Sequence, residues 1–239
     1  MTEPSPHVTT ERLDSVMVVH LDDGKANALS ATMIAAISTA LDEAEADDTI
    51  GAVVLHGRPG RFCAGFDLSV MRGGDFAAVA TLVSDGGELV RRLYGSSVPI
   101  VAASTGHALA AGALILLGCD VRVGADIDCK IGLNEVAIGM VLPAWAITIA
   151  QERLSRRHIQ LAVATAQVTD GAGAVQAGFL DVVVPEAEVL PAAIEKATEL
   201  AALNGRAYAG TVLALRGSVL DRMAAQVTAD REAGATPAV

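Results

Sequence analysis

Short apolar runs alternate with helical patterns along this chain, and together they predict an α/β fold. Residues 51–57 and 98–104 are runs of Val, Ile, Leu and Ala bounded by turn residues, which is typical of buried strands. An alternating apolar and polar pattern predicts another strand within residues 10–22, ending in a turn at 22–24. Shorter strands are expected at 120–124, 129–132 and 179–185.

Helical periodicity fills the segments between these strands. Ser30 is a suitable N-cap for a helix over residues 31–46, whose Met33, Ile34, Ile37 and Leu41 share one face. Further helices are expected over residues 75–94, 111–118, 143–153 and 155–165. Thr169 or Asp170 is expected to cap another helix. The last two predicted helices span 186–203 and 206–231, and residues 233–239 are expected to be frayed.

The chain divides into two predicted parts. Residues 1–185 are expected to form the core domain, because no interdomain linker interrupts them. Residues 186–239 form a helical segment that is too thin to bury a core of its own, so it must dock on another surface.

Composition narrows the classes of partner. A net charge of −11 argues against nucleic acid and against anionic membrane surfaces, which both require clustered Lys and Arg. The three cysteines fit no zinc spacing, so no metal site is expected, and their sparse, odd number suits a reducing compartment. No signal peptide is visible in residues 1–9, and the apolar run 108–117 is too short to span a bilayer, so a cytoplasmic location is expected.

Two stretches, residues 61–68 and 107–114, carry the candidate chemistry. Each places small residues after an extended run and before a helical pattern, where backbone N–H groups have no intrahelical partner. Two such amides converging on one point would stabilise an oxyanion. Glu135 follows as a lone carboxylate in apolar surroundings. An oxyanion clamp and one carboxylate are sufficient to move a proton next to a carbonyl.

Five segments, in this order and spacing, resemble the crotonase superfamily, the enoyl-CoA hydratase and isomerase group. They are residues 25–29, 62–68, 106–112, 119–120 and 131–135. The resemblance implies a ClpP-like ββα superhelix with a helical C-terminal trimerisation region, assembled as a homotrimer or a hexamer. It also implies an acyl-CoA thioester as the ligand, so that CoA is part of the substrate and no separate cofactor is expected.

The same resemblance assigns residues to roles. The backbone N–H groups of Ala64 and Ala111 would form the oxyanion hole, and Glu135 would be the acid and base. Family hydratases carry a second glutamate at the position of Leu114. Leucine there, together with Asn134 before Glu135, is similar to the Δ3,Δ2-enoyl-CoA isomerase branch. One base would then remove a proton from C2 and return it to C4, in a dry pocket that raises its pKa.

Further residues are candidates for substrate contact. Lys25 and Arg61 are expected to meet the CoA phosphates. The acyl pocket would be lined by Phe66, Met71, Leu114, Met140, Leu142 and Trp145. The remaining candidates in the motifs are Ala26, Phe62, Gly65, Asp67, Leu68, Gly112 and Asn134. For Asp67 a helix cap is the favoured interpretation, and His107 and Cys63 are expected to be ordinary core residues.

Three other functions stay open at this stage. A hydratase could recruit a second polar group, such as Asp67 or His107. The chain could instead bind acyl-CoA without turnover, since it has a single carboxylate and Ala111 replaces the more usual glycine. Thioester or carbon–carbon hydrolysis, which the same superfamily hosts, would use the same oxyanion hole.

Overall fold

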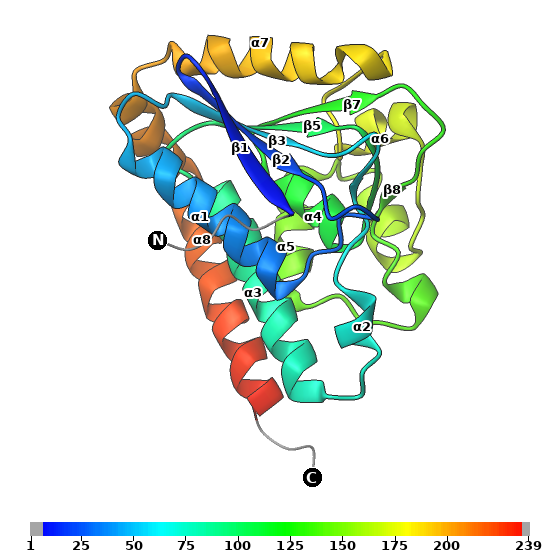
Figure 1. Ribbon diagram of the computed structural model, residues 1–239. Helices are drawn as coiled ribbons and strands as arrows, with labels where there is room; N and C mark the ends of the chain where they lie inside the picture. The colour runs from blue at the N-terminus through cyan, green and yellow to red at the C-terminus, as the bar shows by residue number, and fades with distance from the viewer. Residues whose placement is uncertain (1–6, 236–239) are drawn as a thin grey trace.

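Two sheets organise the part of the chain that the computed structural model describes, residues 7–235 (Figure 1). The larger sheet has the strand order β1-β2-β3-β5-β7-β9, in which β1 and β2 are antiparallel and the remaining neighbours are parallel. Its strands are β1 Val8–Leu13, β2 Val16–Leu21, β3 Ala52–His56, β5 Ile100–Ser104, β7 Val121–Ala125 and β9 Val182–Val184.

The smaller sheet holds three parallel strands in the order β4-β6-β8. They are β4 Gly60–Cys63, β6 Gly106–Leu109 and β8 Ile131–Gly132. Each of them follows a strand of the larger sheet, β3, β5 and β7 respectively, and the chain continues into helices after each. This repetition of two strands and a helical segment is the predicted ββα superhelix.

Helices cover both faces of the larger sheet. Helix α7, Val189–Ala201, lies over one face, and α1 Ala31–Ala46, α3 Phe76–Tyr94 and α4 Ala111–Gly118 lie on the other (Figure 1). Because side chains alternate along a strand, Val16 and Val18 of β2 pack in the core beneath α7, whereas Met17 and Val19 join the larger core on the opposite side. Burial on both faces explains the continuous apolar runs of the central strands.

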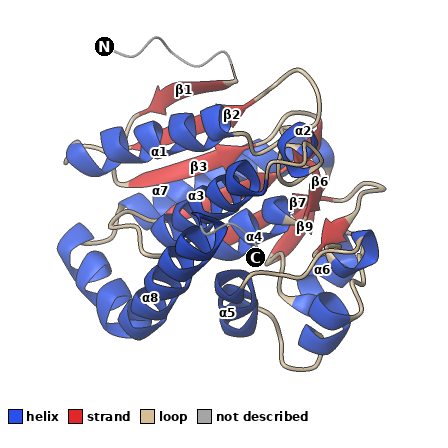
Figure 2. Cartoon of the chain, turned by 90° about the horizontal axis from the view of Figure 1, so that it is seen from below, coloured by secondary structure: helices blue, strands red, loops and turns tan. Residues whose placement is uncertain are grey.

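The remaining helices flank these layers. Helix α8, Gly205–Ala235, runs beside α3 and also contacts α5 (Figure 2). None of the helices within residues 7–235 is long and apolar enough to cross a membrane. The other elements are α2 Leu68–Met71, α5 Ala144–Arg153, α6 Gly171–Ala177, 3-10 turns at Val136–Ile138 and Glu186–Glu188, and a π-helical turn at Gln160–Ala164.

Most predicted elements are present, and the local signals that located them are confirmed. Ser30 Oγ accepts a hydrogen bond from Met33 N at 3.1 Å, and Asp170 Oδ1 caps α6 by accepting from Gly173 N at 2.8 Å. The prediction of a single strand within residues 10–22 is wrong. The chain turns at Asp14, which has φ +53°, and forms a hairpin of β1 and β2. Strand β1 is an exposed edge strand, so few of its positions carry an apolar signal.

One predicted helical segment differs in the structure. Residues 155–165 form a turn and a short π-helical segment, not a regular helix. The end predicted to be frayed, 233–239, extends beyond the described residues, and α8 is described as far as Ala235.

The C-terminal segment docks on the core of its own chain through a buried polar cluster. Asp120, which follows α4, accepts hydrogen bonds from Ile100 N at 2.8 Å and from Tyr208 Oη of α8 at 2.9 Å. Arg216 of α8 lies 2.7 Å from the Asp120 carboxylate and stacks over the ring of Tyr94, 4.6 Å from its centroid. The side chains of Asp120 and Arg216 are each only 11% exposed, so the pair fixes α8 where solvent does not compete.

Replacing Asp120 by Asn is expected to lower the free energy of unfolding by about 3 kcal/mol, because Arg216 would remain buried without a counter-charge. Urea unfolding followed by circular dichroism measures this loss. The matched control is Glu152→Gln, which removes a more exposed ion pair with Arg222 at 3.3 Å and should cost less than about 1 kcal/mol. Equal losses in the two variants would contradict the anchoring role of Asp120.

Gly112 allows α4 to pack directly on β4. A Cβ at this position would lie 2.0 Å from the carbonyl oxygen of Cys63, a backbone atom that cannot rotate away. Gly112→Ala is therefore expected to destabilise the protein by roughly 3 kcal/mol in the same unfolding experiment. Gly217→Ala in α8 is the control, since its Cβ would meet only Leu213 Cδ1 at 3.8 Å and should stabilise the helix by up to about 1 kcal/mol. A neutral Gly112→Ala would show that β4 and α4 can separate without cost.

Candidate active site

The three strands of the small sheet end at one edge and place three segments side by side. Leu109 of β6 is paired with Gly132 of β8, and Ala110 N donates to Gly132 O at 3.0 Å. Cys63 of β4 is paired with Ala108 of β6. Because the strands are parallel, their carboxyl ends lie at the same edge, the position at which α/β sheets usually bind ligands.

The start of α4 presents unpaired amides at this edge. Among the described residues, the N–H groups of Ala111 and Gly112 have no hydrogen-bond partner, whereas those of Ala113 and Leu114 both reach Ala110 O. Ala110 itself has φ +50° and ψ −122°, a conformation that glycine adopts more readily than alanine. This strained turn directs the first amides of α4 out of the helix, and Ala111 therefore remains a suitable oxyanion donor.

The prediction that Ala64 N–H is the other oxyanion donor is wrong. Its N–H already donates to the carbonyl of Ala26 at 3.1 Å. Phe66, two residues later, forms a parallel bridge with Leu29. Leu29 N donates to Gly65 O at 2.8 Å, and Leu29 O accepts from Asp67 N at 3.3 Å. In a parallel ladder this pattern turns the N–H of the bridged residue away from its partner strand.

Phe66 N–H accordingly points away from Leu29. No hydrogen-bond partner for it exists within residues 7–235. The preceding residue, Gly65, lies against the start of α4, because a Cβ there would come within 3.1 Å of Leu109 O and 3.7 Å of Ala111 N. We therefore assign the second amide of the pair to Phe66. Motif reading missed it, since the bridge to Leu29 joins segments far apart in the sequence.

Glu135 follows β8 by three residues and carries a buried carboxyl group. It is 7% exposed, and burial raises its pKa to about 7. Its Oε2 atom has no hydrogen-bond partner among the described residues, and neither has Oδ1 of the adjacent Asn134. The 3-10 turn that follows holds the backbone in place, because Glu135 O accepts from Ile138 N at 3.0 Å and from Met140 N at 2.9 Å.

Helix α4 itself contributes no second acid to this edge. Its residues are Ala, Gly, Leu and Ile throughout, and Leu114 is 1% exposed. The edge thus combines two outward amides with one buried carboxyl group of elevated pKa. Such an arrangement can stabilise a carbonyl oxygen that becomes an oxyanion while a single group removes or returns a proton.

An apolar hollow of about 350 Å³ begins one residue after Glu135. Met140 and Leu142, two of the predicted acyl-pocket residues, lie in its wall. The remainder of the wall consists of Val136, Gly139, Val141, Ile147, Val163 and Ala164. A hollow of this composition suits a hydrocarbon chain.

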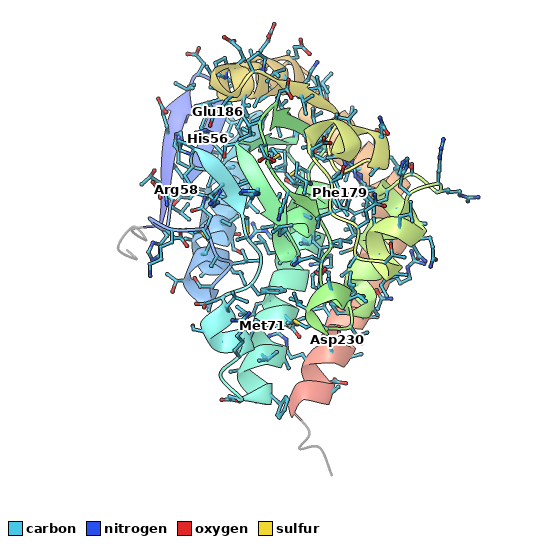
Figure 3. The ribbon with its side chains drawn as sticks, turned by 90° about the vertical axis from the view of Figure 1, so that its right-hand side faces the viewer. His56, Arg58, Met71, Phe179, Glu186 and Asp230 are labelled. Carbon is cyan, nitrogen blue, oxygen red and sulfur yellow. The ribbon has the colours of Figure 1, made fainter. Side chains whose placement is uncertain are left out.

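Other predicted acyl-pocket residues belong to the core. Trp145 is 0% exposed, and its indole lies where a Cβ on Gly87 of α3 would be placed, 2.7 Å away. Phe62 is also 0% exposed, so its assignment to substrate contact is wrong in this structure. The ring of Phe66 fills the space above Gly86 of α3. Met71 is half-buried on α2, in the lower half of the view in Figure 3.

The remaining residues predicted to contact substrate either cap a helix or are exposed. Asp67 caps α2, as favoured from the sequence, by accepting from Ser69 N at 2.8 Å, so its carboxylate is already engaged. Leu68 is 53% exposed, and Lys25 and Arg61 are also exposed. Burial raises the pKa of Cys63 to about 12, which keeps this thiol protonated and unreactive.

Comparisons with known proteins identify the family of this chain. The model of the Enoyl-CoA hydratase/isomerase family matches residues 11–236. Mitochondrial enoyl-CoA delta isomerase 1 of Homo sapiens is 32% identical over 218 residues, covering 90% of this chain and 72% of the relative. A probable enoyl-CoA hydratase of Bacillus subtilis is 31% identical over 196 residues, covering 78% and 71%.

Solved structures give the same result. An enoyl-CoA hydratase/isomerase family protein from Pseudomonas syringae superposes with a TM-score of 0.92 at 38% identity, over 96% of this chain and 99% of that one. Human mitochondrial delta3-delta2-enoyl-CoA isomerase superposes with a TM-score of 0.90 at 31% identity, over 95% and 90%. The family match spans nearly the whole chain, and we conclude that this protein belongs to the enoyl-CoA hydratase/isomerase family of the crotonase superfamily.

Proposed function

We propose that the protein is an enoyl-CoA isomerase that moves a double bond from position 3 to position 2 of an acyl-CoA thioester. The single observation that carries this proposal is Glu135, a buried carboxyl group with a pKa of about 7 and no second acid on α4. A relative of this chain that is 32% identical is named as an enoyl-CoA delta isomerase, which supports the same reaction.

In the proposed reaction the thioester oxygen lies between the N–H groups of Phe66 and Ala111. The carboxylate of Glu135 removes a proton from C2, and the electrons of that C–H bond pass through the thioester to give an enolate. The two amides stabilise its negative oxygen. The protonated Glu135 then returns the proton to C4 as the double bond shifts to position 2. The reaction needs no group besides the thioester, and we propose that it uses no separate cofactor.

Water addition is the alternative reaction, since a 31% identical relative is named as a probable hydratase. It requires a positioned water molecule and commonly a second polar group. The candidates considered from sequence are poorly available, because Asp67 caps α2 and His107 Nδ1 accepts from Lys130 N at 2.9 Å. The apolar side chain of Leu114 at the hydratase glutamate position also disfavours a bound water.

We further propose that the chain assembles as a homotrimer or a dimer of trimers, as the family resemblance implies. Large apolar side chains that remain exposed support a further interface. Val141 is 89% exposed, and Leu213 and Leu215 of α8 are 67% and 73% exposed. A neighbouring copy would bury such side chains.

Replacing Glu135 by Gln is expected to lower kcat for 3-enoyl-CoA by about 10²–10⁴-fold, because the amide cannot accept the C2 proton. The absorbance of the conjugated 2-enoyl thioester reports the reaction. Glu186→Gln, an exposed carboxylate elsewhere, is the matched control and should retain full activity. Since burial penalises the charged carboxylate, Glu135→Gln should also unfold at a higher temperature at pH 8, which separates lost chemistry from lost folding.

Two outcomes would contradict this assignment. Unchanged turnover in Glu135→Gln would remove Glu135 from the mechanism. Water addition to 2-enoyl-CoA that is faster than conversion of 3-enoyl-CoA would identify the wild-type protein as a hydratase.

The rate should depend on pH through the same group. Glu135 must be ionised to act as the base, so kcat/KM for 3-enoyl-CoA is expected to rise about tenfold per pH unit below pH 7 and to level off above it. A profile measured from pH 5 to pH 9 shows the midpoint. A profile that stays flat from pH 5 to pH 8 would mean that a group other than Glu135 controls the rate.

A further inference from the structure

Two adjacent glycines stand in the middle of α3. The helix spans 19 residues, and Gly86 and Gly87 are both buried within it. Glycine destabilises the interior of a helix relative to alanine, because it loses more conformational freedom on folding. Neither residue has a positive φ, so the helical backbone does not require glycine here. The reason for glycine must therefore lie in the space beside each residue.

The two glycines make room for different aromatic rings. A Cβ on Gly86 would lie 2.4 Å from Cε1 and 2.5 Å from Cζ of Phe66. A Cβ on Gly87 would instead lie 2.7 Å from Cε2 of Trp145 and 2.9 Å from Cγ2 of Val227. Consecutive residues of a helix point about 100° apart, which is why the neighbouring glycines meet separate partners. Gly86 thus borders the residue assigned as an oxyanion donor, whereas Gly87 borders the core between α3, α5 and α8.

The backbone on both sides of Phe66 is tied to Leu29. Leu29 N donates to Gly65 O at 2.8 Å, and Leu29 O accepts from Asp67 N at 3.3 Å. The first of these bonds holds the peptide group between Gly65 and Phe66, and the same peptide group carries the Phe66 N–H. Gly65 has φ +97° and the wide conformational freedom of glycine. A single hydrogen bond to its carbonyl therefore leaves this peptide group free to tilt.

The ring of Phe66 provides a second point of attachment. The ring packs against the larger core, and Leu29 Cδ2 lies beside it, 3.7 Å from the Cβ position of Gly86. Helix α2, which begins two residues after Phe66, also packs beside α3 (Figure 1). A side chain on Gly86 would push the ring away from α3. Because phenylalanine occupies discrete rotamers, the backbone of Phe66 and its N–H would move with the ring.

We propose that Gly86 is a positioning residue for the oxyanion hole, because its lack of a side chain lets the Phe66 ring lie against α3 and so directs the Phe66 N–H toward the thioester oxygen. The inference rests on the proposed function, in which the N–H groups of Phe66 and Ala111 bind that oxygen. Oxyanion donors act over about 2.7–3.1 Å, so a small displacement of the ring is sufficient to weaken one of them. The proposal extends the site to α3, a helix in which the sequence motifs placed no site residue.

Gly86→Ala and Gly87→Ala form a matched pair of variants. Both add one methyl group to the interior of the same helix, and both meet an aromatic ring, at 2.4 Å and 2.7 Å respectively. Gly86→Ala is expected to lower kcat for 3-enoyl-CoA by about 10- to 100-fold, with KM within about threefold of the wild type. Gly87→Ala should keep kcat within about twofold, although both variants should unfold at a lower temperature. A merely structural role would make the losses of kcat follow the unfolding temperatures.

A second measurement does not depend on turnover. The absorption of a conjugated arylacryloyl-CoA moves to longer wavelength when its thioester oxygen accepts hydrogen bonds. The wild type and Gly87→Ala are expected to produce the same shift on binding this ligand, and Gly86→Ala about half of it or less. A shift in a wild-type protein that does not isomerise 3-enoyl-CoA would contradict the proposed reaction and still support the role of Gly86.

A double variant tests whether Gly86 acts through the ring. Phe66→Leu removes the ring, and it is expected to lower kcat because the peptide group loses its second attachment. Adding Gly86→Ala to Phe66→Leu should lower kcat by less than about twofold further. The double variant avoids the overlap with the ring, so it remains measurable even if Gly86→Ala alone unfolds. An equally large effect of Gly86→Ala with and without the ring would contradict the proposal.

Three other outcomes would overturn the role of Gly86. The first is a wild-type kcat and a wild-type absorption shift in Gly86→Ala. The second is an equal loss of kcat in Gly86→Ala and Gly87→Ala. The third is the absence of any shift in the wild type, which would remove the pair of amides and, with it, the residue that positions one of them.

Discussion

The register of three short parallel strands is the constraint on which the site depends. The hydrogen bond from Ala110 N to Gly132 O ties the turn before Ala111 to the strand that leads to Glu135. Side chains alternate along strands, so a slip of one residue between β6 and β8 would move Glu135 relative to the amides and expose buried positions. The near contact between Gly112 and Cys63 O fixes β4 against α4 in the same manner. The relative placement of the reacting groups is therefore a property of packing between strands and α4.

The edge of the small sheet where its strands end contains several groups that lower the stability of the protein. Glu135 is a carboxyl group buried without a partner for Oε2, Ala110 occupies a backbone conformation that favours glycine, and the amides of Phe66 and Ala111 are unsatisfied. Each of these features costs on the order of 1–3 kcal/mol. They are tolerated because cores on both faces of the larger sheet and the Asp120–Arg216 cluster stabilise the surrounding structure. All of these costs lie at the positions that would contact a thioester.

In the proposed isomerase, the apolar side chain of Leu114 is what would separate the two reactions of the family at this edge. Leu114 occupies a fully packed position of α4, where an acid would otherwise face the substrate. Without that acid, Glu135 has no polar neighbour on the helix to hold a water molecule, and its own burial keeps its pKa near neutrality. The apolar hollow beside Met140 and Leu142 continues the same dry environment beyond the reacting carbons.

The sequence by itself determined what depends on neighbouring residues: the buried strands, the caps at Ser30 and Asp170, and the superhelix through its motifs. It also named Glu135 as the candidate acid. It did not determine which amide faces the substrate, because that depends on the distant bridge between Phe66 and Leu29. Likewise only packing between α3 and α5 decided that Trp145 is core. The local sequence pattern predicts burial and turns. The direction of a backbone N–H and the neighbours of a side chain are instead set by contacts between segments that are far apart in the chain.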